Sequence, residues 1–202
     1  DQRFAFDLNG DGETENVPLL AGNRGYLALD TNQNALIDNG LELFGPGTGN
    51  GFAELARHDS DGNGWIDEAD PVYQQLIDGP VLLGRFDWRE FTINGITHYL
   101  VVTGDNQTDL TRFAADLALI CQQQVAVFGA LPADLSSYWF LLWVTEDGYG
   151  GLEHLNSTLL LCSRFDLPTP NLPTINDSYQ NLLALCSHEY FHTWWVKRLK
   201  PA

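Results

Sequence analysis

The chain has 202 residues and carries 27 acidic against 10 basic side chains, a formal net charge of -17. This charge repels phosphate backbones and anionic lipids, so it argues against nucleic acids and membrane surfaces as partners. Hydrophobic residues make up 44% of the chain, but no apolar run reaches the roughly 18 residues that a membrane span needs. We therefore expect a soluble globular protein of one large or two small domains.

The acidic side chains are concentrated in the first part of the chain. Residues 1–78 hold 15 acidic and 3 basic side chains, whereas residues 79–202 hold 12 and 7. The junction, Asp78-Gly79-Pro80, consists of turn residues without a long linker. The composition therefore predicts two modules, 1–78 and 79–202.

Residues 59–70 (DSDGNGWIDEAD) match a calcium-binding loop at every position. Calcium takes six to eight oxygen ligands, and an EF-type loop supplies them from alternate positions, with glycine at position 6 and an acid at 12. Apolar residues at helical spacing precede the loop and a proline follows it, so we expect a helix, a loop and a helix. The predicted ligands are Asp59, Asp61, Asn63, Asp67, Asp70 and the carbonyl of Trp65.

Two earlier loops fit the same template less well. Positions 1, 3, 5 and 9 of one loop are filled by Asp30, Asn32, Asn34 and Asp38. Its acid Glu42 comes one residue after position 12. Positions 1, 3 and 5 of the other are filled by Asp7, Asn9 and Asp11. A metal-free turn is the alternative for any one loop, but three such loops within 64 residues favour calcium.

Residues 4–77 resemble calcium-loop segments of bacterial secreted and surface proteins, with a loop like those of EF-hands and dockerins. The resemblance implies structural calcium, because fifteen acids repel one another until cations neutralise them. We therefore expect a periplasmic or secreted location, with the cytoplasm as an alternative for the second module. One interpretation of the chain is therefore a calcium-binding, dockerin-like interaction or structural module without catalytic activity, and it stands as the alternative to the enzyme function discussed below.

The second module alternates strand and helix patterns, which indicates an α+β fold. Alternating or buried apolar runs predict strands, with Asn94-Gly95 as a hairpin turn, at 81–86, 89–94, 96–103, 137–145 and 157–163. Helical periodicity predicts helices over 107–128 and from about Ser178 to Leu199, the latter capped by Asp177 or Ser178. Cys121, Cys162 and Cys186 are expected to pack as apolar residues, and a disulfide between Cys162 and Cys186 remains open.

The last predicted helix contains an H-E-x-x-H motif, His188-Glu189-Tyr190-Phe191-His192. Side chains four residues apart share a helical face, so both imidazoles can bind one zinc ion. Glu189 then reaches the metal-bound water as general base. The alternative is a helix with an exposed polar stripe, but the apolar residues around the trio predict partial burial, and buried ionisable groups need a metal or partners.

A second motif, DGYGGLEH, spans residues 147–154. Together with LLLCSRFDLP and LLALCSHEYFHTWWVKRLKP, it resembles the glycyl-aminopeptidase family of thermolysin-like zinc metallopeptidases over residues 80–202. The resemblance implies a peptide substrate with a free amino terminus, which Glu153 would grip. It places zinc on His188 and His192, with Glu189 as base, and substrate on Gly150, Gly151, Glu153 and His154. For His154, a role as a turn residue without contact to substrate is an equally good interpretation.

The family's third zinc ligand is a glutamate on a following helix, about twenty residues beyond the motif, and the sequence stops ten residues after His192. Catalytic zinc needs three protein ligands and an open position. We therefore expect 79–202 to be the sheet and active-site helix of a larger domain, with weak or no activity alone and its C-terminal half as a partner. Lys197 and Arg198 are expected to be structural, next to the helix C-terminus.

Overall fold

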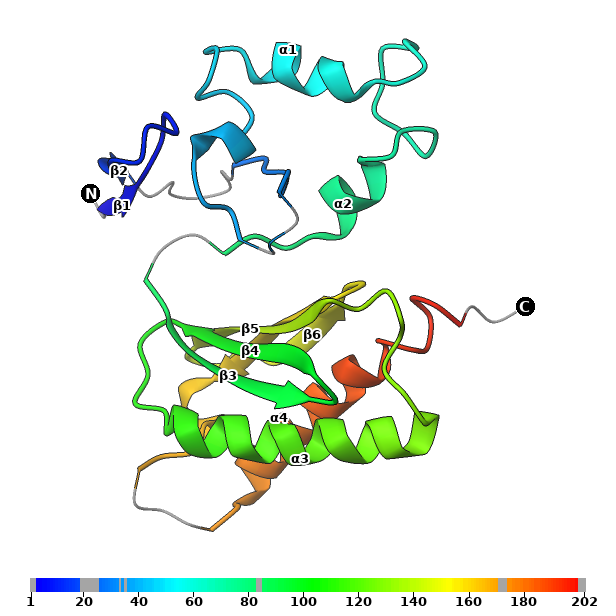
Figure 1. Cartoon of the computed structure of the whole chain (residues 1–202). Coiled ribbons are helices and arrows are strands. Elements are labelled where there is room, and N and C mark those ends of the chain that lie inside the picture. Colours follow the sequence, from blue (N-terminus) through cyan, green and yellow to red (C-terminus); the bar gives the residue numbers. More distant parts are fainter. Residues whose placement is uncertain are drawn as a thin grey trace. The chain divides into compact units, whose positions relative to one another are not determined.

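The computed structural model describes residues 3–18, 26–32, 34, 36–82, 85–170 and 174–199. The chain divides into two compact units, Asp1–Gly84 and Arg85–Ala202, shown in Figure 1. The division lies six residues after the predicted junction. Within the described ranges, no helix is both long enough and apolar enough to cross a membrane.

The first unit consists of short elements joined by loops. Its strands are β1 (Arg3–Phe6) and β2 (Glu15–Pro18), which pair antiparallel. Its helical segments are η1 (Gly40–Glu42), α1 (Gly51–Leu55), η2 (Ala56–His58) and α2 (Tyr73–Asp78). Residues 59–70 therefore lie between two helical segments, in the predicted order. The buried apolar side chains described in this unit are only Val17, Leu29 and Leu43, which is a small core for a module of this size.

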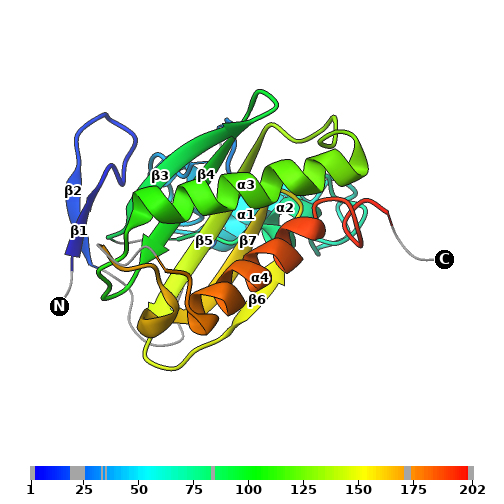
Figure 2. The same cartoon turned by 90° about the horizontal axis from the view of Figure 1, so that it is seen from below.

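The second unit is a five-stranded mixed sheet with two long helices on one face (Figures 1 and 2). Its strands, in the spatial order β3-β4-β5-β7-β6, are β3 (Asp87–Ile93), β4 (Ile96–Thr103), β5 (Ser137–Thr145), β7 (Ser157–Ser163) and β6 (Gly150–Glu153). Strands β4, β5 and β7 run parallel, and both edge strands are antiparallel to their neighbours. The helices are α3 (Leu110–Phe128) and α4 (Asp177–Phe191), with a short η3 (Arg164–Asp166) before α4.

The core of the second unit fills the space between the sheet and the two helices. Phe140 and Leu142 of β5 and Leu117 of α3 are completely buried there. Alternate residues of a strand point to opposite faces, so Trp143 on the same β5 strand faces away from the helices and is 56% exposed. One face of α4 is thus buried against this core, while residues such as His188 on the other face are exposed.

Most of the predicted elements are confirmed. Strands 96–103, 137–145 and 157–163 have the predicted bounds, and the Asn94-Gly95 turn has the positive φ angles (48° and 85°) that a tight hairpin requires. Helix 107–128 begins later, at Leu110, because the Asp109 side chain caps it.

Two predictions are wrong. The described residues of 81–86 form no strand. Helix α4 is capped by Asn176 and ends at Phe191 instead of Leu199, because the N–H groups of Thr193 and Trp194 bond three residues back and the chain then turns at Val196, whose φ is 73°. Strand β6 was not among the predicted strands. All three cysteines are buried free thiols, as expected, and Cys162 and Cys186 form no disulfide.

The completely buried His98 links β4 to α4. Its Nε2 lies 2.8 Å from the Tyr190 hydroxyl and its Nδ1 lies 3.1 Å from the Ile96 carbonyl oxygen. Loss of solvation lowers the pKa of His98 to about 4, although the Ile96 carbonyl opposes the shift. The folded state therefore favours the neutral imidazole.

This burial predicts a loss of stability in mild acid. Because the unfolded chain takes up the His98 proton near pH 6.5, the free energy of unfolding should fall by about 2 kcal/mol between pH 7 and pH 5. Urea unfolding of the second unit in the wild type and in His98→Gln measures the difference, since the variant lacks this proton uptake. An NMR titration that placed the pKa of His98 near 6.5 would contradict the prediction.

Candidate metal centre

Helix α4 brings both histidines of the H-E-x-x-H motif to one point. The Nε2 atoms of His188 and His192 lie 3.2 Å apart, and the rings are nearly perpendicular. Two ring nitrogens that face each other need a proton or a cation between them. Ligand nitrogens of a tetrahedral zinc ion, with Zn–N bonds of about 2.0–2.1 Å, are roughly 3.3 Å apart. The observed separation fits zinc.

The main chain orients the His192 ring through Nδ1, the ring nitrogen that does not face His188. Its Nδ1 lies 3.3 Å from the carbonyl oxygen of Trp195. A hydrogen on Nδ1 that is donated to this oxygen leaves the Nε2 lone pair available on the side of His188. Metal-binding histidines are commonly fixed in this way.

Glu189 is buried beside the two histidines, with 4% of its surface exposed. Its Oε2 atom makes no hydrogen bond within the described part of the chain. Burial raises the pKa of Glu189, and the two neighbouring histidines oppose this shift. A buried carboxylate oxygen without a donor needs a partner outside the protein, and solvent on a metal is such a partner. The predicted burial of the trio holds for Glu189, whereas His188 is exposed.

The edge strand β6 supplies the other wall of this centre. Gly151 and Glu153 pair with Leu160 and Thr158, which are completely buried, so they share the helix-facing side of the sheet. Ligand atoms of Glu153, Glu189 and His192 all lie within 4.8 Å of one another. The structure thus brings these sequence-predicted residues together around one point.

The other two predicted substrate residues lie differently. Gly150 is next to Gly151, but a side chain added there would meet no atom within 4 Å. His154 follows β6 and is 9% exposed, and its main-chain N–H donates to the Ser157 carbonyl. The structure shows the ring of His154 buried at the end of β6, close enough to lower the pKa of Glu189.

The loop over residues 59–70 also gathers acidic oxygens. Ligand atoms of Asp59, Asp61 and Asp70 lie within 4.8 Å of one another. Asp59 accepts hydrogen bonds from the main-chain N–H groups of Gly62, Asn63 and Gly64. Asp70 is buried and closes the loop by accepting from Ser60 and Asp67. Its position-12 carboxylate therefore already has protein donors.

In each of the two loops that fit the calcium template less well, an acid outside position 12 accepts hydrogen bonds from the main chain of the loop. Glu42 is buried and accepts hydrogen bonds from the N–H groups of Thr31 and Asp38, at 3.1 and 2.9 Å. Glu15 accepts from the Leu8 N–H at 2.7 Å and from the Asn9 amide at 3.1 Å. Each acid bonds the N–H of the loop's second residue, as Asp70 does. The spacing differs between the loops, so position 12 of the template misses both acids, although Glu42 follows that position by one residue.

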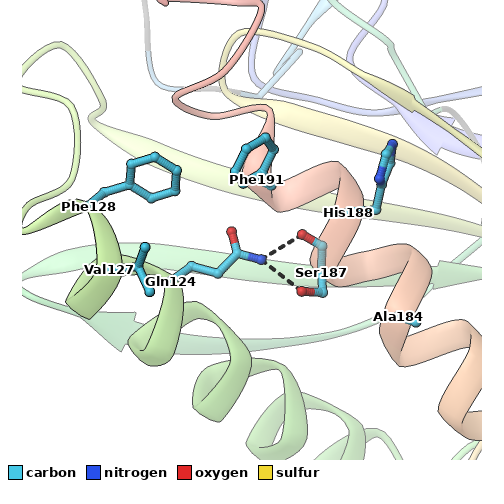
Figure 3. Close-up of a pocket in the computed structure, with 7 residues that line it drawn as sticks. All are labelled: Gln124, Val127, Phe128, Ala184, Ser187, His188 and Phe191. Atoms are coloured by element: carbon cyan, nitrogen blue, oxygen red, sulfur yellow. Dashed lines mark hydrogen bonds between the residues drawn. The ribbon is translucent and has the colours of Figure 1, made fainter.

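A groove of about 400 Å³ lies between α3 and α4, beside the metal centre (Figure 3). Gln124 on α3 donates from Nε2 to the carbonyl and hydroxyl oxygens of Ser187, at 2.6 and 2.8 Å, and so holds the helices together below it. The groove is lined by Gln124, Val127, Phe128, Ala184, Ser187, His188 and Phe191.

Comparison with known proteins relates each unit to a different group. Residues 1–78 match the SPM domain family, and residues 181–202 match the M61 glycyl aminopeptidase family. Iron-regulated protein FrpA of Neisseria meningitidis serogroup C is 37% identical over 79 residues, 35% of this chain and 7% of FrpA. An aminopeptidase N family protein from Idiomarina loihiensis has a crystal structure that covers 64% of this chain at 50% identity, with a TM-score of 0.62. The chain spans 22% of that protein.

These comparisons connect the second unit with peptidases. The M61 match includes both histidines and Glu189, and the aminopeptidase structure agrees with the mixed α+β fold. The chain covers only a small part of either relative, so their whole activities do not transfer to it directly. The match of the first unit is to the SPM domain, and its likeness to EF-hands and dockerins stays an expectation.

Proposed function

We propose that the second unit is the zinc-binding part of an aminopeptidase-type hydrolase. The observation that carries this proposal is the 3.2 Å approach of the two Nε2 atoms next to the buried, unbonded Oε2 of Glu189. His188 and His192 would hold the metal. Zinc bound there supplies a Lewis acid that acidifies water and polarises a peptide carbonyl.

The protein's own groups then have separate tasks. Glu189 takes a proton from the attacking water at its carboxylate and returns it to the leaving amine, because the carboxylate is buried beside the two histidines and burial raises its pKa. Glu153 pairs with the ammonium group of a peptide's first residue. The free edge of β6 offers main-chain groups to an extended peptide.

For the first unit we propose calcium binding that stabilises the fold. The support is the convergence of Asp59, Asp61 and Asp70 together with the small apolar core of this unit. A calcium-stabilised interaction module without catalysis is the second candidate function, and it is favoured if the second unit binds no zinc.

Zinc binding tests the first proposal directly. The full chain, freed of metal, is expected to bind about one zinc ion per molecule, measured by competition with a chromogenic chelator. His188→Ala should lose this binding because only one imidazole remains. Glu189→Gln should keep it but lose any zinc-dependent hydrolysis of glycyl or alanyl anilides. Equal zinc uptake by the wild type and His188→Ala would refute the assignment.

A further inference from the structure

We propose that Arg198 is a positioning residue of the metal centre, which fixes the turn after α4 so that the Trp195 carbonyl orients His192. This inference rests on the proposed zinc function and adds a residue outside the H-E-x-x-H motif. Its starting point is the 3.3 Å contact between the Trp195 oxygen and Nδ1 of His192.

The carbonyl of Trp195 is placed by a compact turn. The Val196 N–H donates to the Leu199 carbonyl at 2.9 Å, and the Leu199 N–H donates to the Trp194 carbonyl at 2.8 Å. Val196 has a φ of 73°, a conformation that is unfavourable for a β-branched residue. Such a conformation persists only where surrounding contacts enforce it.

Arg198 supplies those contacts from within the turn. Its side chain is 17% exposed, and its Nη1 donates to the carbonyl oxygens of Thr193 at 2.7 Å and Leu155 at 3.0 Å. Its Nε pairs with Asp134 at 2.9 Å, a contact that lowers the pKa of this carboxyl. One guanidinium group thus joins the turn to the loop before β5 and to the residue that follows His154.

The geometry requires arginine. A guanidinium group is a planar fork that can reach three acceptors at once, whereas an ammonium group is a point charge on a flexible stem. Because Thr193 lies two residues after the end of α4 and Leu155 two residues after the end of β6, Arg198 joins the chain segments that follow these two elements. The role is therefore positional, and Arg198 contacts neither the zinc histidines nor substrate by any described hydrogen bond.

The test uses Arg198→Ala and Arg198→Lys in the full chain, with Arg164→Ala as the control. Arg164 also pairs with two carboxylates in this unit, Asp105 and Glu146, away from the turn. Both Arg198 variants should bind zinc 10- to 100-fold more weakly, the usual cost of losing support behind a metal ligand. In the zinc-free protein, ¹⁵N NMR should show His192 protonated at Nδ1 in the wild type and in mixed tautomers in the variants. Arg164→Ala should leave both readouts unchanged.

The outcomes separate this inference from the proposed function. Wild-type zinc affinity and an unchanged His192 tautomer in both Arg198 variants would overturn the positioning role. The zinc proposal would then still be supported by a loss of zinc binding in His188→Ala. A wild type that binds no zinc would overturn the proposed function, and the tautomer measurement would still decide whether Arg198 orients His192. Arg198→Lys keeps the charge, so it supplies the answer if Arg198→Ala does not fold.

Discussion

Replacing Gly151 with alanine is expected to lower any zinc-dependent peptide hydrolysis by roughly 10²-fold, the order of loss that a displacement of about 1 Å causes in an active site. A methyl group at this position would overlap Oε1 of Glu189 and lie 2.5 and 2.6 Å from its Cδ and Cγ atoms. Glu189 is 4% exposed and cannot move freely into solvent. The Glu189 carboxylate, to which we assign the proton transfer, must therefore shift.

The neighbouring glycine is a matched control for this prediction. A methyl group at Gly150 would meet no atom within 4 Å, so Gly150→Ala should leave Glu189 in place and lose much less of the rate than Gly151→Ala. Zinc affinity of Gly151→Ala should stay within about threefold of wild type, because the three atoms closest to the new methyl group all belong to Glu189. Equal rates for Gly151→Ala and Gly150→Ala would contradict the prediction, because they would show that a methyl group at residue 151 does not disturb the action of Glu189.

Removal of calcium is expected to unfold the first unit while the second unit stays folded. The first unit has little apolar core, and its loops carry most of its acidic side chains. A site with a dissociation constant of about 10⁻⁴–10⁻³ M adds about 1.4–2.7 kcal/mol at 10 mM calcium. Circular dichroism melts with calcium, with magnesium and with EDTA should therefore resolve a low transition that moves upward only with calcium.

Two matched variants locate this effect in the loop over residues 59–70. Asp61→Asn keeps an oxygen acceptor for the Asn63 N–H group but removes a charge from the site, so the calcium-dependent part of the shift should shrink. Glu68→Gln removes the same charge from an exposed residue of the same loop and should behave as the wild type does. A melt of the first unit that is identical in calcium and in EDTA would contradict the calcium proposal.

The sequence predicted the parts of the structure that local patterns determine. The β-strand over 137–145 is a continuous apolar run, and the Asn94-Gly95 pair has few alternatives to a tight turn. The approach of His188 and His192 was equally predictable, because a spacing of four on a helix fixes their common face regardless of the rest of the chain.

Long-range contacts determine the parts that the sequence did not predict. Strand β6 is four residues long and rich in glycine, and it is a strand because β7 pairs with it. The end of α4 was placed eight residues too late, because Val196 and Leu199 continue the apolar pattern while the main chain of residues 194–199 bonds to itself as a turn. Likewise, Glu15 and Glu42 close their loops through hydrogen bonds that no fixed spacing describes.

The position of β6 at the border of the sheet has one further consequence. The outer edge of β6 presents a row of main-chain amide and carbonyl groups. A peptide that pairs with them is recognised through its own main-chain groups, which all residues except proline share in full. Glu153, at the end of this row, faces the metal side and favours a positive charge. Such a site would discriminate between the end of a polypeptide and its middle, and would tolerate many side chains beyond the first.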